Sequence, residues 1–155
     1  MALAGAQVLD AIKQRMLGLS LTGTRVYTDR AHPLDEKSVL PAWKVVSPDE
    51  DIETVTVHPA PVQQHRMQVE LQGYVSAISD VDDAMHALAA QALTALFNPP
   101  LVPDALSAIA GTKVKLSQRR IERAMSGEGQ AKLGLIQITL RAEYRTKQNA
   151  PEALA

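Results

Sequence analysis

Residues 64–77 alternate between apolar and polar side chains from Met67 onward, and this pattern constrains the fold more than any other part of the sequence. Met67, Val69, Leu71 and Val75 share one set of alternate positions, and polar residues fill most of the other set. Successive side chains of a strand point to opposite faces, so the pattern predicts a long strand with one buried and one hydrated face. Such strands are typical of antiparallel sheets that carry their helices on one side.

Two segments have helical periodicity instead. In residues 6–17 and 80–97 the apolar side chains recur three or four positions apart, which places them on one helix face. Asp82 and Asp83 stand in the first turn of the second segment, where the helix dipole favours anions. We therefore predict two amphipathic helices that cover the buried face of the sheet.

The remaining strands are shorter or less regular. They are predicted from β-branched residues and local alternation at 24–28, 40–46, 52–58, 113–125 and 131–145. A turn is expected at 47–51, between the second and third of them.

The element order is then one helix, four strands, a second helix and two strands. Runs of strands interrupted by helices favour an α+β domain, with an antiparallel or mixed sheet and the two main helices on one face. The domain is predicted to span 1–146. The polar, proline-containing segment 147–155 is predicted to be a disordered tail.

Composition excludes several classes of function. The chain of 155 residues has no cysteine, which rules out disulfides, thiolate metal sites and a cysteine nucleophile. Its net charge of −1 does not mark it as a nucleic-acid-binding protein. No apolar run is long enough to cross a membrane, and the N-terminus lacks the features of a signal peptide, so we expect a cytoplasmic product.

Candidate reactive residues are few. The nearest approach to a metal site is formed by Asp80, Asp82, Asp83 and His86, yet capping and dipole effects at a helix start explain these residues already. An acid/base pair would form only through tertiary contacts among the loop carboxylates, which are Asp35, Glu36, Asp49, Glu50 and Asp51. We therefore predict no catalytic, cofactor-binding or metal-binding residue.

Charged side chains concentrate in a polar loop at 29–38 and in the strand at 113–125. Regular alternation would place Lys115, Arg119 and Arg123 on one face of that strand. This basic row is either a solvated face beside acidic neighbours or a contact surface for another subunit. The residues predicted to lie at an interface are Asp29, Arg30, Asp35, Glu36, Lys37, Lys115, Arg119 and Arg123.

Five local features occur in a familiar order. The strand at 40–46 begins Leu-Pro-Ala-Trp, and an acidic turn follows at 48–51. The next feature is the alternating pattern of residues 67–75. A helix then opens at 79–83, and the last strand reaches Leu-Arg-Ala-Glu-Tyr at 140–144. In this order the chain resembles the tail terminator family of long-tailed bacteriophages, of the lambda-like minor tail protein U type.

The resemblance covers about residues 1–146, and it implies a virion structural protein rather than an enzyme. Such a protein would form a homohexameric ring on the head-proximal end of the tail, after assembly in the cytoplasm of the host bacterium. The ring would cap the tail tube, stop its polymerisation and provide the surface for head–tail joining.

The implied partners are further copies of the chain, the tail tube protein and the head–tail connector protein. DNA would pass through the lumen without specific binding, and neither a cofactor nor a membrane is implied. Two alternatives stay open: a head–tail connector or neck (head completion) protein, and a small α+β enzyme.

Overall fold

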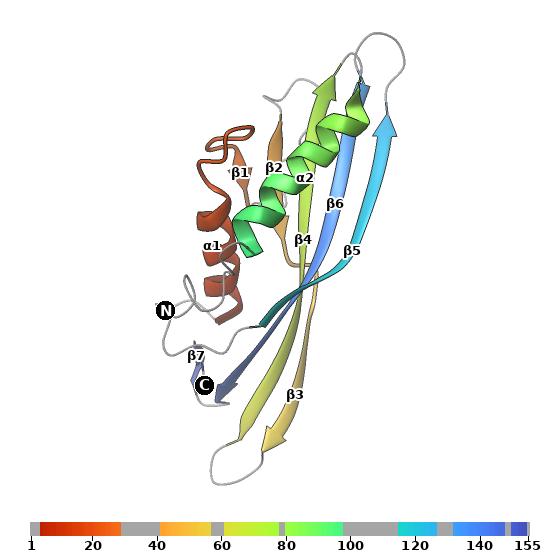
Figure 1. The fold of residues 1–155 in the computed structure, drawn as a ribbon. Helices are drawn as coiled ribbons and strands as arrows, with labels where there is room; N and C mark the ends of the chain where they lie inside the picture. The colour runs from red at the N-terminus through yellow and green to blue at the C-terminus, as the bar shows by residue number, and fades with distance from the viewer. Residues whose placement is uncertain are drawn as a thin grey trace.

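The computed structural model describes residues 4–28, 41–56, 61–77, 80–97, 115–126, 132–147 and 150–154. These residues form two helices on one side of a seven-stranded mixed sheet (Figure 1). The elements are α1 (Ala4–Met16), β1 (Val26–Tyr27), β2 (Ala42–Val46), β3 (Glu50–Thr56), β4 (Val62–Ala77), α2 (Val81–Phe97), β5 (Lys115–Ser126), β6 (Lys132–Lys147) and β7 (Ala150–Leu154). The predicted α+β class, with a mixed sheet and both helices on one face, is confirmed.

The long strands β4 and β6 form the centre of the sheet. They pair antiparallel along their whole length, with Leu71 opposite Ile138 and Val69 opposite Leu140. The sheet order is β1-β2-β4-β6-β5, with β3 also beside β4 and β7 beside β6. Only β1 and β2 run parallel; every other pair of neighbouring strands in the described part of the chain is antiparallel.

The core lies between the helices and one face of this central pair. The predicted burial of Met67, Val69 and Leu71 is confirmed. Ile136, Ile138 and Leu140 of β6 are buried beside them. The helices contribute the apolar stripes that their periodicity predicts, including Val8, Ile12 and Met16 from α1 and Met85, Leu88 and Leu96 from α2. Burial of this aliphatic surface is the main driving force for folding.

The predicted turn at 47–51 is wrong. Strands β2 and β3 both run antiparallel to β4, so the chain keeps its direction between them. Pro48 has no N–H to offer to a ladder, and Ser47 Oγ instead donates a hydrogen bond of 2.7 Å to the Gln68 carbonyl. Residues 47–49 therefore interrupt one long edge of the sheet without reversing it.

The predicted disordered tail at 147–155 also differs from the structure, which places strand β7 at Ala150–Leu154. Within the described residues, the pairing of β5 with β6 ends at Lys115 and Glu143, which leaves the last residues of β6 without a β5 partner. Strand β7 pairs there with Thr146 and Lys147. Polar composition suggested disorder because the sequence does not reveal that β6 extends past its neighbour.

Gly73 interrupts the apolar face of β4 at the point where Trp43 crosses it. The two residues are directly opposite each other in the β2–β4 pair. A Cβ atom on Gly73 would lie 2.8 Å from both Leu88 Cδ2 and Trp43 Cζ3. The missing side chain thus makes room for the indole ring under α2.

We expect Gly73→Ala to lower the free energy of unfolding by about 1–3 kcal/mol, because the new methyl group overpacks this contact. The effect would oppose the gain that alanine usually brings over glycine in a strand. Urea unfolding followed by circular dichroism would measure it. Ser76→Ala, at an exposed position of the same strand, is the control and should change stability little. Equal stability of both variants would contradict this account of the core.

Candidate functional site

The structure describes three of the eight predicted interface residues. Asp29, Arg30, Asp35, Glu36 and Lys37 lie outside the described residues. Lys115 opens β5, where its backbone is described, and Arg119 and Arg123 follow on the same strand with exposed side chains.

A β-bulge in β5 overturns the prediction that these basic residues share one face. Gln118 lies opposite Leu140, but the next pair is Arg120 with Thr139, so Arg119 is an extra residue in the strand. A bulge of this kind reverses the alternation beyond it. Because residues directly opposite each other share a face of the sheet, the partners of each β5 residue show where it lies.

Lys115 is opposite Glu143 and Arg120 is opposite Thr139, both on the face without helices, called the open face here. Arg123 is opposite Ile136, a core residue, and therefore lies on the helix face. The basic strand thus presents cations on both faces.

The open face contains a charged hollow of about 230 Å³ that spans several strands. The residues that line it, among those described, are Asp49, Asp51, Arg66, Gln68, Arg119, Thr139, Leu140 and Arg141. Both signs of charge line the hollow, which suits contact with a polar protein surface better than capture of phosphate.

The ion pairs around this hollow are loose. Arg66 lies 3.3 Å from Glu53 and 3.9 Å from Glu143, and Arg141 lies 3.8 Å from Glu143. Exposed pairs of this kind contribute little to stability. Their charged groups can therefore be redirected to a partner at small cost.

On the helix face, Arg123 reaches His86 of α2. A guanidinium N–H donates to His86 Nε2 over 2.5 Å, and both side chains are exposed. The imidazole thus has a cationic neighbour, which opposes binding of a metal ion there. Within the described ranges, no group of three or more histidine and carboxylate side chains is placed to hold a metal ion.

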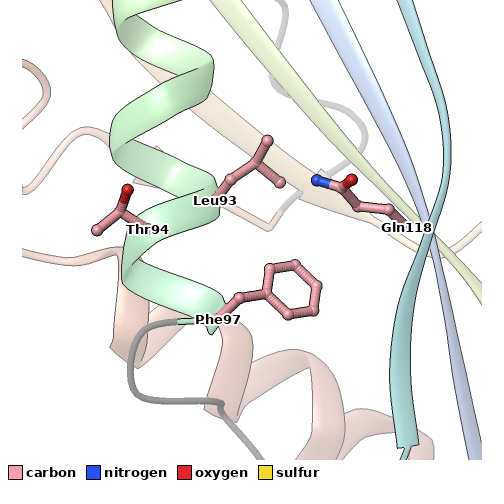
Figure 2. Close-up of a pocket in the computed structure, with 4 residues that line it drawn as sticks. All are labelled: Leu93, Thr94, Phe97 and Gln118. Atoms are coloured by element: carbon pink, nitrogen blue, oxygen red, sulfur yellow. The ribbon is translucent and has the colours of Figure 1, made fainter.

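A second hollow, of about 470 Å³, separates the end of α2 from β5. Figure 2 shows Leu93 and Phe97 pointing from α2 toward β5, where Gln118 points back toward the helix. Thr94 lies at its margin, and none of these four lining residues is titratable. The hollow is an apolar recess on the surface without a reactive group among these residues.

A polar cluster at the far end of the helix face, buried apart from the exposed Glu50, was not predicted from the sequence. His65 Nδ1 lies 2.8 Å from Glu50 Oε1, and His65 Nε2 lies 2.7 Å from Thr146 Oγ1. A carboxylate can only accept, so Nδ1–H donates to Glu50, and Nε2 of a neutral ring accepts from the threonine hydroxyl. Tyr144 also donates its O–H to Glu50 and stacks on His65, with ring centroids 4.7 Å apart.

The first turn of α1 closes over this cluster. A Cβ atom on Gly5 would lie 3.0 Å from the Tyr144 oxygen and 3.4 Å from Glu50 Oε2. Burial raises the pKa of Tyr144 above its usual value, and the hydrogen bond to Glu50 and the charge of Glu50 raise it further. The hydrogen bonds of the cluster therefore join β3, β4 and β6, and α1 packs over it.

The carboxylate–imidazole–hydroxyl order has the connectivity of a hydrolase triad. Thr146 is fully buried and His65 is 7% exposed, so the hydroxyl is not presented to a substrate in this structure. Glu50, one of the carboxylates at 49–51, is paired with His65 by a tertiary contact, which is the kind of contact that any acid/base pair there needs. Period-two alternation could have flagged the cluster, because His65 and Thr146 fall on the apolar faces of their strands, where polar groups need partners.

Comparisons with known proteins identify no family. No protein-family model matches the chain, and no curated protein matches it. Among solved structures, a chain of the "Virion of native gene transfer agent (GTA) particle" is similar, with 14% sequence identity and a TM-score of 0.48. The likeness covers 92% of this chain and 98% of that chain. A likeness at this level does not identify a function.

No helix in the described part of the chain is both long and apolar enough to span a membrane.

Tyr144→Phe should lower stability at neutral pH by about 1.5–3 kcal/mol, because Glu50 loses a donor. This stability advantage of the wild type should shrink in alkali. Above the ordinary tyrosine pKa of about 10 the unfolded state loses this proton while the folded state, with its raised pKa, keeps it. Wild-type stability should then fall relative to the variant by up to about 1.4 kcal/mol per pH unit.

Urea unfolding of both proteins at about pH 7 and from about pH 10 to 11.5 would check this. All other titrating groups are common to the two proteins, so the difference in stability between them reports Tyr144. A stability difference that stays constant over the whole range would contradict the buried Tyr144 hydroxyl.

Proposed function

We propose that the chain is a structural protein of a phage-like virion, acting as a tail terminator. It would form a hexameric ring on the head-proximal end of the tail tube, stop polymerisation and provide the surface for head–tail joining. The proposal rests on the order of sequence features that resembles the tail terminator family. Apart from the acidic turn at 48–51, where the structure has the start of β3 and no reversal, the described elements follow that order from α1 to β6.

The observation that carries the proposal is the division of charge between the two faces of β5. A terminator needs two unlike surfaces, since one must bind the tube end and the other must refuse a further tube subunit. Like charges brought together can make a surface refuse a wrong partner. The two faces of β5 differ in their surroundings: Arg119 lines the hollow of mixed charge on the open face, whereas Arg123 donates to His86 on the helix face.

The polar surfaces around these residues also agree with a contact role. The open-face hollow holds both signs of charge, and the histidine and threonine of the triad-like cluster are buried. The proposed partners are further copies of the chain, the tail tube protein and the connector protein. DNA would pass through the ring without specific binding, because a lumen that grips phosphate would slow ejection.

A head–tail connector or neck protein is the main alternative, because its contacts would use the same kinds of surface. Purified tail tubes distinguish the two roles. A terminator should bind the tube end in the absence of heads and prevent further growth, whereas a connector should bind only tubes that are already capped.

The two faces can be tested separately with Arg119→Glu and Arg123→Glu, after native mass spectrometry has shown that each single variant still forms rings. Each variant would complement a phage that lacks the protein, and electron microscopy would measure tail length and the fraction of tails joined to heads. Overlong tails from one variant and normal but unjoined tails from the other would assign the faces.

Arg145→Glu, an exposed reversal on β6, is the matched control and should leave tails normal. Tails of normal length that join heads in all three variants would refute the proposed role of β5.

The loop at 29–38 gives a further prediction. Reversal of Asp35 and Glu36 to lysine should weaken ring assembly while the monomer stays folded, because charged loops set the register of such contacts. Light scattering would report assembly and circular dichroism would report folding. Unchanged assembly of the double variant would remove this loop from the interface.

A further inference from the structure

Strands β3 and β5 are the outer strands on opposite sides of the β4–β6 pair. Strand β3 pairs with β4 and β5 pairs with β6, and no strand in the described part of the chain pairs with the other edge of either. An edge strand exposes a row of backbone donors and acceptors that another strand can pair with. Such edges are usually protected by charge.

The two edges carry opposite charge. Strand β3 has three acidic residues and no basic one, which gives −3. Strand β5 has four basic residues and one acidic residue, which gives +3. If the edge charges served only to prevent pairing, the same sign on both edges would be more effective, because the edges of neighbouring copies would then repel each other. Opposite signs attract one copy to the next.

The side chains of the two strands also match face by face. On β3, Asp51 and Glu53 lie opposite Arg66 and Gln64 and so occupy the open face. On β5 the same face carries Arg119 and Arg120. The acidic and basic side chains would therefore meet on one side of a sheet continued from copy to copy.

On the helix face, the two edge strands carry exposed apolar side chains. Ile52 of β3 lies opposite His65 and is 55% exposed. Ile121 and Met125 of β5 lie opposite Ile138 and Gly134 and are 48% and 57% exposed. These large apolar side chains stand on the same face of the two edges, where pairing would cover them.

We propose that β3 of one copy pairs with β5 of the next copy, so that the sheet continues through the assembly. Strand β3 already runs antiparallel to β5 within one chain, because each neighbouring pair from β3 through β4 and β6 to β5 is antiparallel. A head-to-tail neighbour would preserve that relation. Contacts between two different surfaces close into a ring when the rotation between copies permits. The inference rests on the ring of the proposed function and names the surfaces that form it.

Charge-reversal variants test this pairing. One variant is Asp51→Arg with Glu53→Arg, and the other is Arg119→Glu with Arg120→Glu. Each alone would present two edges of like sign, and its apparent self-association should weaken about tenfold or more. Native mass spectrometry and electron microscopy of the purified chain would follow ring formation, and urea unfolding would confirm that each variant folds.

Mixing the two variants is the decisive measurement. Each intact edge of one variant is complementary to the intact edge of the other, and the two reversed edges are complementary to each other. The mixture should therefore form rings of alternating copies, and a single chain with all four substitutions should assemble alone. Asp10→Lys with Ala87→Lys and Ala90→Lys raises the net charge by as much as the acidic-edge variant does, at exposed helix positions, and should assemble normally.

The outcomes separate the two proposals. If the wild type forms rings and both variants assemble normally, the β3–β5 contact is wrong but the proposed ring is not contradicted. Folded variants that fail alone and also fail when mixed would overturn complementary pairing of these edges. A wild-type chain that stays monomeric at high concentration and does not assemble on tube ends would overturn the ring and the contact together.

Discussion

The antiparallel pairing of β4 with β6 is the constraint on which the rest of the structure depends. The two strands match residue for residue over sixteen positions, and their apolar faces form the floor of the core. A shift of one residue would turn either apolar face to solvent, so burial itself fixes the register. Both helices, the Trp43–Gly73 contact and the Glu50–His65 cluster take their places from that register.

The bulge in β5 shows how one extra residue changes the functional surface. Without it, Arg123 would share a face with Arg119, and the basic strand would present a single charged side. With it, cations reach the open-face hollow from one side and His86 of α2 from the other. Proposals about tube binding, head joining and subunit contact all depend on this division of charge.

The buried cluster around His65 places polar groups where an aliphatic core would otherwise continue. Its hydrogen bonds connect residues from β3, β4 and β6, and α1 covers them. Removal of one partner would leave a buried polar group unsatisfied, which costs more than the hydrogen bond gains. The cluster thereby holds the far end of the sheet in one arrangement, beside the acidic edge of β3.

Sequence periodicity alone determined the helices, the long strands and the buried faces of β4 and β6, because each rests on local alternation between apolar and polar side chains. It did not determine that Pro48 interrupts an edge without turning the chain, that Arg119 is an extra residue, or that β6 extends past β5. Those features depend on which strands pair with each other and on the register of each pair. The same holds for the candidate site: Glu50, His65, Tyr144 and Thr146 are far apart in the chain, and only tertiary contact brings one carboxylate, one imidazole and two hydroxyls within hydrogen-bonding distance.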